Sequence, residues 1–274
     1  MAVSIEDIKK LREMTGAGLG DCKKALAESN GDMEGAIEII RKKGQAVAAK
    51  RSDREAAEGC VLCKVENGFG AIVALKCETD FVAKNADFVK LAQDILDAAV
   101  AAKCKTQDEV LALPMGDGTV ADAITARSGI TGEKMELDGY SYIEGDNISC
   151  YNHQNKNFLC TMVQLSKSVD AQYGHAVAMQ IAAMNPISIS ENDVPADVKA
   201  REFEIAADKA REEGKPENMV ERIAEGRMKK FYKEQCLLMQ EFIQDSKLSV
   251  ADYLHQADAD CTILAFNRFT LRAE

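Results

Sequence analysis

One order of elements occurs twice in this sequence, and it limits the possible folds more than any other feature. In the first copy, apolar runs at 61–65 and 69–77 flank Asn67 and Gly68, the dipeptide most typical of a two-residue β-hairpin turn. A polar segment follows, and then apolar residues at helical spacing over 88–96. This order predicts a hairpin whose second strand leads into a helix.

The second copy has the same elements but little sequence in common with the first. Apolar residues at 148–151 and 158–165 flank a polar turn, and a helical pattern over 176–183 ends before Asn185 and Pro186. Two hairpins, each followed by a helix, predict a two-part core of antiparallel sheets and helices.

The first 44 residues predict three short helices. Ser4 is followed three residues later by an acidic residue, as in a capping box, and three glycines within 16–20 separate this helix from one starting at Asp21. Asp32 is suited to cap the third helix, which we expect to end at Gly44.

The rest of the chain divides by composition and pattern. An Ala-rich, charged stretch without a wide apolar face reads as a linker, and a long helical region interrupted by Gly214, Lys215 and Pro216 reads as a helical hairpin. We expect a short helix and a final strand after it. The predicted α+β organisation is a three-helix domain at 1–44, a linker at 45–58, a first core half at 59–140, a second core half at 141–194, a helical arm at 195–235, and the end of the second half with its last strand at 236–274.

Composition narrows the class of partner. The formal net charge is −11 and the pI is about 5.0, which argues against nucleic acid as the main partner and favours a protein. The chain lacks a secretory signal pattern and any apolar run of the length that a membrane span needs. Together with nine cysteines, this pattern predicts reduced thiols in the cytoplasm, without direct membrane contact. The oligomeric state stays open, a homodimer included.

Two motifs suggest chemistry but favour a structural interpretation. Gly16, Gly18 and Gly20 resemble a phosphate loop, yet a helix precedes them and no Lys-Ser/Thr pair follows, so a helix–helix turn is favoured. Cys60 and Cys63 resemble half of a zinc site, but residues three apart on a strand face opposite sides, and no second close pair follows. We therefore predict no metal, no cofactor and no catalytic residue.

The segment from Thr79 to Asn85 places one aromatic ring, Phe81, beside a carboxylate, Asp80, directly after an apolar strand. Taken from the residues alone, Phe81 is expected to pack into its own domain, with Asp80 capping a helix that begins near Val82.

Three motifs give the chain a close resemblance to one family. Residues 11–26 (LREMTGAGLGDCKKAL), 77–85 (CETDFVAKN) and 225–231 (EGRMKKF) resemble, in order, signatures of the elongation factor Ts family. The resemblance extends from the N-terminus into the final third of the chain. It implies a ubiquitin-associated-like N-terminal domain, a two-part core and a coiled-coil arm. It also implies a guanine-nucleotide exchange factor, not an enzyme, whose partner is the GTPase elongation factor Tu.

The family resemblance also assigns residues. Asp80, Phe81, Val82 and Ala83 match the stretch with which the family dislodges magnesium from elongation factor Tu, and this reverses the interpretation of Phe81 as a packed core ring. Arg12, Leu19 and His153 match further residues with which the family contacts its partner. Gly20 stands where members often carry a larger apolar residue, and longer members have a C-terminal helical module that we do not expect here.

Two other functions remain to be discriminated. A helical adaptor that uses its N-terminal domain would bind a partner regardless of the partner's nucleotide state. A cysteine-dependent enzyme would contain a thiol of unusual reactivity.

Overall fold

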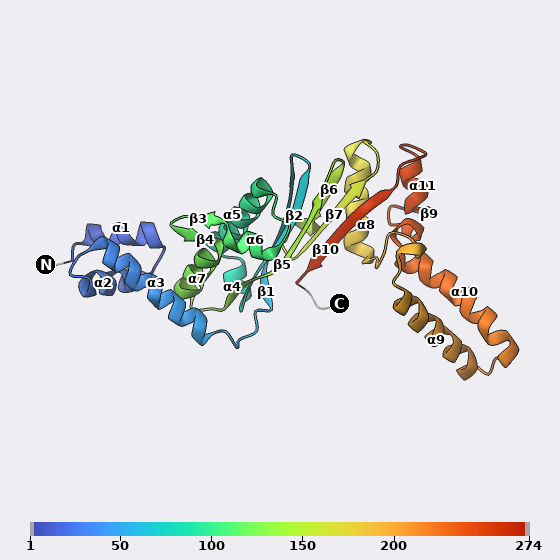
Figure 1. Ribbon diagram of the computed structural model, residues 1–274, viewed down its shortest axis with the longest axis horizontal. Coiled ribbons are helices and arrows are strands. Elements are labelled where there is room, and N and C mark those ends of the chain that lie inside the picture. The colour runs from blue at the N-terminus through green and yellow to red at the C-terminus, as the bar shows by residue number, and fades with distance from the viewer. Residues whose placement is uncertain (1–2, 272–274) are drawn as a thin grey trace. The chain divides into compact units, whose positions relative to one another are not determined.

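The N-terminal segment folds as three helices in the computed structural model, which describes residues 3–271 (Figure 1). These are α1 (Ile5–Thr15), α2 (Leu19–Glu28) and α3 (Met33–Lys50). The side chains of Ser4 and Asp32 cap α1 and α3, as predicted. α2 begins at Leu19, two residues earlier than expected, because Gly18 already has the extended backbone of a helix N-cap. The helices enclose a small core of Leu11, Ala17, Cys22, Ala25, Leu26 and Ala36.

The third helix does not end at Gly44, as we expected from the sequence, but continues to Lys50. Gly44 is buried where α3 crosses α7 (Val120–Thr131). A Cβ atom on Gly129 of α7 would lie 2.3 Å from the Cα atom of Gly44, so the two backbones approach closely here. Gly44 therefore permits a helix–helix contact and is not a helix stop.

The chain separates into two units, which are described one at a time. The first contains the described residues up to 62, residues 72–141 and those from 270. The second contains residues 63–71 and 142–269.

The predicted first hairpin forms part of a sheet with strand order β1-β2-β5. Its strands are β1 (Glu58–Glu66), β2 (Phe69–Cys77) and β5 (Met135–Glu144). Asn67 and Gly68 join β1 to β2 with positive φ angles of 50° and 72°, the geometry that favours this dipeptide in a type I′ turn. The chain then forms α4 (Asp80–Ala83), α5 (Ala86–Ala102), α6 (Gln107–Ala112), the short strands β3 (Pro114–Met115) and β4 (Gly118–Thr119), and α7. We predicted none of the elements between α5 and the second hairpin.

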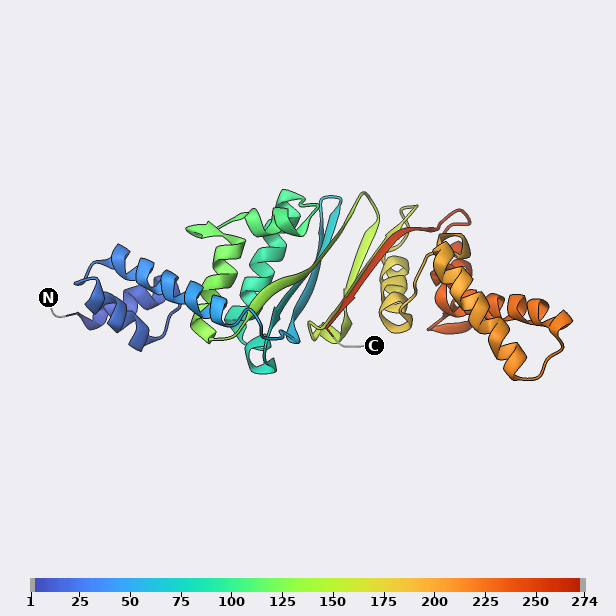
Figure 2. The same cartoon turned by 60° about the horizontal axis from the view of Figure 1, so that its bottom comes forward.

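In the second unit, the predicted second hairpin belongs to a sheet with strand order β10-β7-β6. Its strands are β6 (Ile148–Asn152), β7 (Leu159–Leu165) and β10 (Ile263–Thr270), and α8 (Ala171–Met184) lies against it (Figure 2). β6 and β7 are antiparallel, with Ile148 opposite Gln164. Apolar side chains of β7 pack with Val177 and Ile181 of α8, so this copy has the predicted sheet-and-helix core. The α+β fold class is confirmed.

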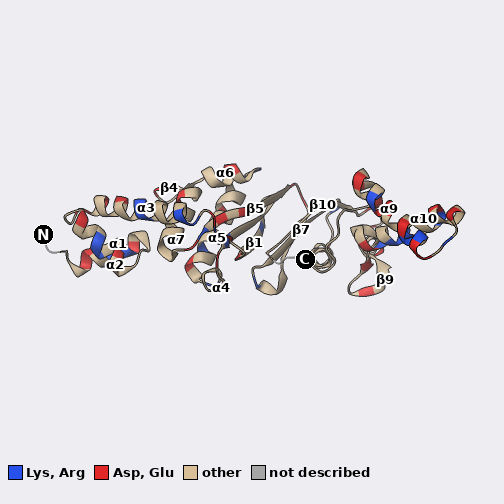
Figure 3. Ribbon diagram, turned by 90° about the horizontal axis from the view of Figure 1, so that it is seen from below, with Lys and Arg blue, Asp and Glu red and all other residues tan. Residues whose placement is uncertain are grey.

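The long helical region is a hairpin, which we call the arm, formed by α9 (Ala196–Glu212) and α10 (Glu217–Gln235). Its two helices meet through small side chains: Ala206, Ala207, Ala210, Val220 and Ala224. Acidic and basic side chains are interspersed along both helices (Figure 3). Arg227 lies within the third family motif and joins the helices, donating to the Glu213 carboxylate at 2.7 Å and to the Ala206 carbonyl at 3.1 Å. After the arm come β8 (Glu241–Phe242), β9 (Asp245–Ser249) and α11 (Val250–His255).

The close contact between α3 and α7 can be tested with alanine substitutions. Gly129→Ala should lower the free energy of unfolding by about 1–3 kcal/mol, because the added methyl group overlaps the Gly44 backbone. The control is Gly226→Ala in α10, where an added Cβ meets nothing within 4 Å. That substitution should raise the stability by up to about 1 kcal/mol. Urea unfolding measures both, and equal stability of the two variants would contradict the close approach.

Candidate protein-binding site

The residues assigned to partner binding in the second motif form one short helix, α4, between β2 and α5. Thr79 is the helix N-cap, and its hydroxyl accepts a hydrogen bond from the Val82 N–H at 3.4 Å. Asn85 follows α4 and caps α5. The prediction that Asp80 caps a helix starting near Val82 is wrong, because Asp80 is itself the first helical residue. α4 is therefore a single turn held between two caps.

Phe81 points into solvent from this turn. Its side chain is 84% exposed, whereas Phe69 and Phe88 on the neighbouring elements are fully buried. The interpretation from the residues alone, in which Phe81 packs into its own domain, is therefore wrong. A large exposed ring on a capped turn is typical of a site that binds another protein, because burying it on association is favourable.

Asp80 carries its charge beside this ring. The Lys84 ammonium donates to the Asp80 carboxylate at 2.6 Å, one helical turn away. This hydrogen bond, aided by the positive charge, holds the pKa of Asp80 below its usual value. The carboxylate is thus ionised at neutral pH and is paired within its own turn.

A second carboxylate, missed from the sequence, contacts the same corner from a distant part of the chain. Glu133 follows α7 and accepts hydrogen bonds from the backbone N–H groups of Glu78 at 3.2 Å and Thr79 at 3.1 Å. It also accepts from the Thr79 hydroxyl at 2.6 Å. No sequence pattern marks Glu133, since 54 residues separate it from Thr79.

Glu78 completes this arrangement in the opposite direction. Its carboxylate accepts from the Lys134 N–H at 2.6 Å and from the guanidinium of Arg51, at the end of α3, at 3.1 Å. The segments at 78–79 and 133–134 thus exchange carboxylate-to-backbone hydrogen bonds.

The two N-terminal residues assigned by resemblance flank one turn. Arg12 is exposed near the end of α1, and Leu19, which is 49% exposed, begins α2. Gly16 ends α1 with a φ of 69°, so a tight left-handed turn lies between these side chains. The glycine-rich stretch is a helix–helix turn, as favoured from the sequence.

His153 belongs to the second unit, in a short turn after β6. Its Nδ1 atom is 3.2 Å from the Tyr151 hydroxyl, and its ring makes edge contacts with Tyr151 and Phe158. The ring of His175 also makes an edge contact with Tyr151. The partner-binding roles of His153, Arg12, Leu19 and the α4 residues stay predictions.

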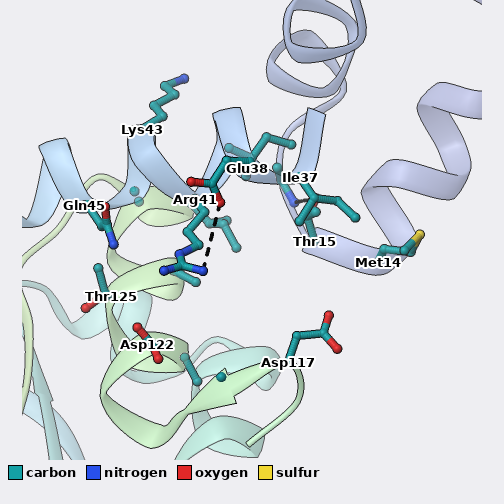
Figure 4. Close-up of a pocket in the computed structure, with 18 of the residues that line it drawn as sticks. Met14, Thr15, Ile37, Glu38, Arg41, Lys43, Gln45, Asp117, Asp122 and Thr125 are labelled. Atoms are coloured by element: carbon teal, nitrogen blue, oxygen red, sulfur yellow. Dashed lines mark hydrogen bonds and ion pairs between the residues drawn. The ribbon is translucent and has the colours of Figure 1, made fainter. Parts of the chain in front are cut away.

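The first unit also has a cavity of about 330 Å³, bordered by α3, α7 and the β3–β4 hairpin (Figure 4). Apolar side chains of Ile37, Ile40 and Ile130 line it. Arg41 extends toward Asp122, whose pKa is lowered first by hydrogen bonds with Thr119 and further by the Arg41 charge (Figure 4). Among the described residues, those assigned to partner binding do not line this cavity.

Several of the described cysteines are buried, and burial disfavours the thiolate form. Burial raises the pKa of Cys60 to about 12, and burial, aided by the nearby Glu133 charge, raises that of Cys77 to about 12. Cys63 hydrogen-bonds with the thiols of Cys150 and Cys160. The hydrogen bond between Cys63 and Cys150 is the main cause of the raised pKa of Cys150. Thiols with these pKa values are protonated and unreactive at neutral pH.

Comparison with known proteins identifies the family. The model of a family described as elongation factor TS matches residues 78–273, which begins at the corner before α4. The chain is 56% identical to elongation factor Ts of Porphyromonas gingivalis and 46% identical to that of Azobacteroides pseudotrichonymphae, over the full length of each pair. The chain belongs to the elongation factor Ts family.

Full-length similarity extends to elongation factor Ts of Bacteroides fragilis, at 53% identity over all of both chains. The name describes a translation elongation factor, and that is the role of this family member. Among the described residues, no helix has the length and apolar character needed to cross a membrane.

The pairing of Asp80 with Lys84 can be tested by titration. Lys84→Met should raise the pKa of Asp80 toward that of an unpaired carboxyl, because the hydrogen bond and the positive charge are lost. NMR detection of the Asp80 carboxyl carbon measures this. The control, Lys90→Met, removes the equivalent ion pair with Asp94 in α5 and should leave Asp80 unchanged. An Asp80 midpoint that is the same in both variants would contradict the pairing.

The cysteine environment gives a second prediction. Cys60 and Cys77 should be alkylated far more slowly in the native protein at pH 7 than in denaturant, since burial disfavours their thiolates. Mass spectrometry after brief iodoacetamide treatment locates the modified residues. Rapid native modification of either thiol would instead favour a reactive cysteine.

Proposed function

We propose that this protein is a guanine-nucleotide exchange factor that binds elongation factor Tu in its GDP form and promotes release of GDP, so that GTP can bind. The observation that carries the proposal is the exposed ring of Phe81 on the capped turn α4, in the motif shared with the elongation factor Ts family. Phe81 inserts between elements of the partner, and Asp80 disturbs the region that holds the magnesium ion. Val82 and Ala83 complete the contact.

The energetics require more than this turn. A nucleotide bound at nanomolar affinity is held by about 12 kcal/mol, much of it through phosphate groups and magnesium. Burying one phenylalanine contributes about 1.5–3 kcal/mol. A wider interface supplies the difference, and we assign Arg12, Leu19 and His153 to it. The interface selects a conformation of the partner that holds nucleotide weakly.

Thermodynamic linkage then fixes the behaviour of the complex. If this protein weakens GDP binding by some factor, GDP must weaken binding of this protein by the same factor. Exchange is therefore reversible and requires no chemical step by the protein. We place this activity in the cytoplasm, with translation.

Release of a fluorescent GDP analogue from elongation factor Tu tests the proposal. The protein should accelerate release, and Phe81→Ala should lower the apparent second-order rate constant by about 30-fold, the effect of removing an interface residue worth about 2 kcal/mol. Because Phe81 is exposed, its substitution should change the stability by less than about 0.5 kcal/mol.

Ile205→Ala serves as the matched control, because it truncates another exposed apolar side chain, on α9 of the arm. Its exchange rate should match that of the unmodified protein. If neither the protein nor its variants accelerate release, the exchange function is wrong. Tight binding that is equal for nucleotide-free and GDP-loaded partner would instead favour an adaptor.

A further inference from the structure

We propose that Glu133 is a positioning residue for exchange: its carboxylate fixes the corner from which α4 presents Phe81 and Asp80. This inference rests on the proposed function and adds to it a residue outside the family motifs quoted above. Glu133 itself is not expected to touch the partner. Its effect passes through Thr79 to the helix turn.

The need for such a residue follows from the length of α4. A helix of four residues has too few internal hydrogen bonds to hold its own direction, because nucleating a helical turn is unfavourable. The direction of Phe81 therefore depends on what holds the two ends of the turn. At the N-terminal end the chain leaves β2, and the N–H groups of Glu78 and Thr79 need acceptors.

One oxygen atom of the Glu133 carboxylate accepts from both of these N–H groups. Its Oε2 accepts the N–H groups of Glu78 and Thr79, while its Oε1 accepts the Thr79 hydroxyl at 2.6 Å. Because that hydroxyl proton is directed to Glu133, the hydroxyl oxygen presents a lone pair to the N–H of Val82. The carboxylate thus orients both the backbone of the corner and the cap that starts α4.

The carboxylate is itself held in place. Gly132 ends α7 in the left-handed conformation, with a φ of 76°, and turns the chain so that Glu133 faces the corner. The buried Ser128 hydroxyl donates to the Glu133 carbonyl, and the Glu133 N–H donates to the Thr131 hydroxyl at 3.3 Å. The end of α7 is therefore a fixed support for a turn that lies 54 residues earlier in the chain.

Two substitutions at this position separate geometry from charge. Glu133→Ala removes all three acceptor contacts and should lower the exchange rate constant about three- to tenfold. Glu133→Gln keeps one carbonyl oxygen for the two N–H groups and places an amide donor near the Thr79 hydroxyl. It should recover most of the activity. Asp138→Ala is the control, because it removes a carboxylate that pairs with Lys76 on β2 without contacting the corner.

A double-mutant cycle tests whether Glu133 acts through Phe81. If it does, Glu133→Ala should have a clearly smaller effect in a protein that already carries Phe81→Ala, because only the positioning of Asp80 is then left to lose. Losses that multiply would overturn the proposal, as would a Glu133→Ala protein with the unmodified exchange rate. If the unmodified protein does not accelerate the release of GDP from elongation factor Tu, the proposed function is wrong, and this inference with it.

Amide hydrogen exchange gives a readout that does not depend on the partner. In Glu133→Ala the amides of Val82, Ala83 and Lys84 should exchange faster than in the unmodified protein, whereas those of β1 should not change. If Glu133→Ala does not fold, Thr79→Val tests the same link, because it removes the hydroxyl that joins Glu133 to the cap. Unchanged protection of α4 in the variant that folds would overturn the proposal.

Discussion

The hydrogen bonds that Glu133 accepts from the corner at Glu78 and Thr79 are the interaction on which the candidate site depends. A strand that leads into a helix in two residues leaves backbone donors without partners, and leaving them buried and unpaired would cost about 1–3 kcal/mol each. The carboxylate removes this cost and fixes a direction for the next turn. A ring in solvent is useful for recognition only if its direction is fixed. The exposed Phe81 therefore depends on the half-buried carboxylate of Glu133.

Glycine determines how closely elements approach in the first unit. Gly44 and Gly129 let α3 and α7 meet at backbone distance, and α3 continues to Lys50, directly before Arg51, whose guanidinium pairs with Glu78. The contact between helices and the corner before α4 are therefore joined through one long helix. Gly44 locally favours a helix end, but here it lies in the contact between α3 and α7.

Local signals in the sequence were sufficient for elements with a strong period or turn. The Asn67-Gly68 turn, the caps at Ser4 and Asp32, and the arm interrupted at Gly214 were all predicted, because each depends on neighbouring residues. The predicted helix end at Gly44 was wrong because glycine is favoured both at helix ends and where two helices approach closely. No sequence pattern marked Glu133, since its carboxylate meets the groups that donate to it only in the folded chain. The site assigned from the motifs depended on resemblance, and its geometry depended on contacts distant in sequence.

The alanine-rich contact of the arm has a consequence for how the protein unfolds. A buried alanine removes little apolar surface from water, so the α9–α10 contact contributes much less free energy per residue than the leucine, isoleucine and valine core around α8. Ion pairs at the surface, such as Arg227–Glu213, add little to this contact, and salt weakens them further. The arm is therefore the part of the second unit that we expect to open first, before the sheet beside α8 unfolds.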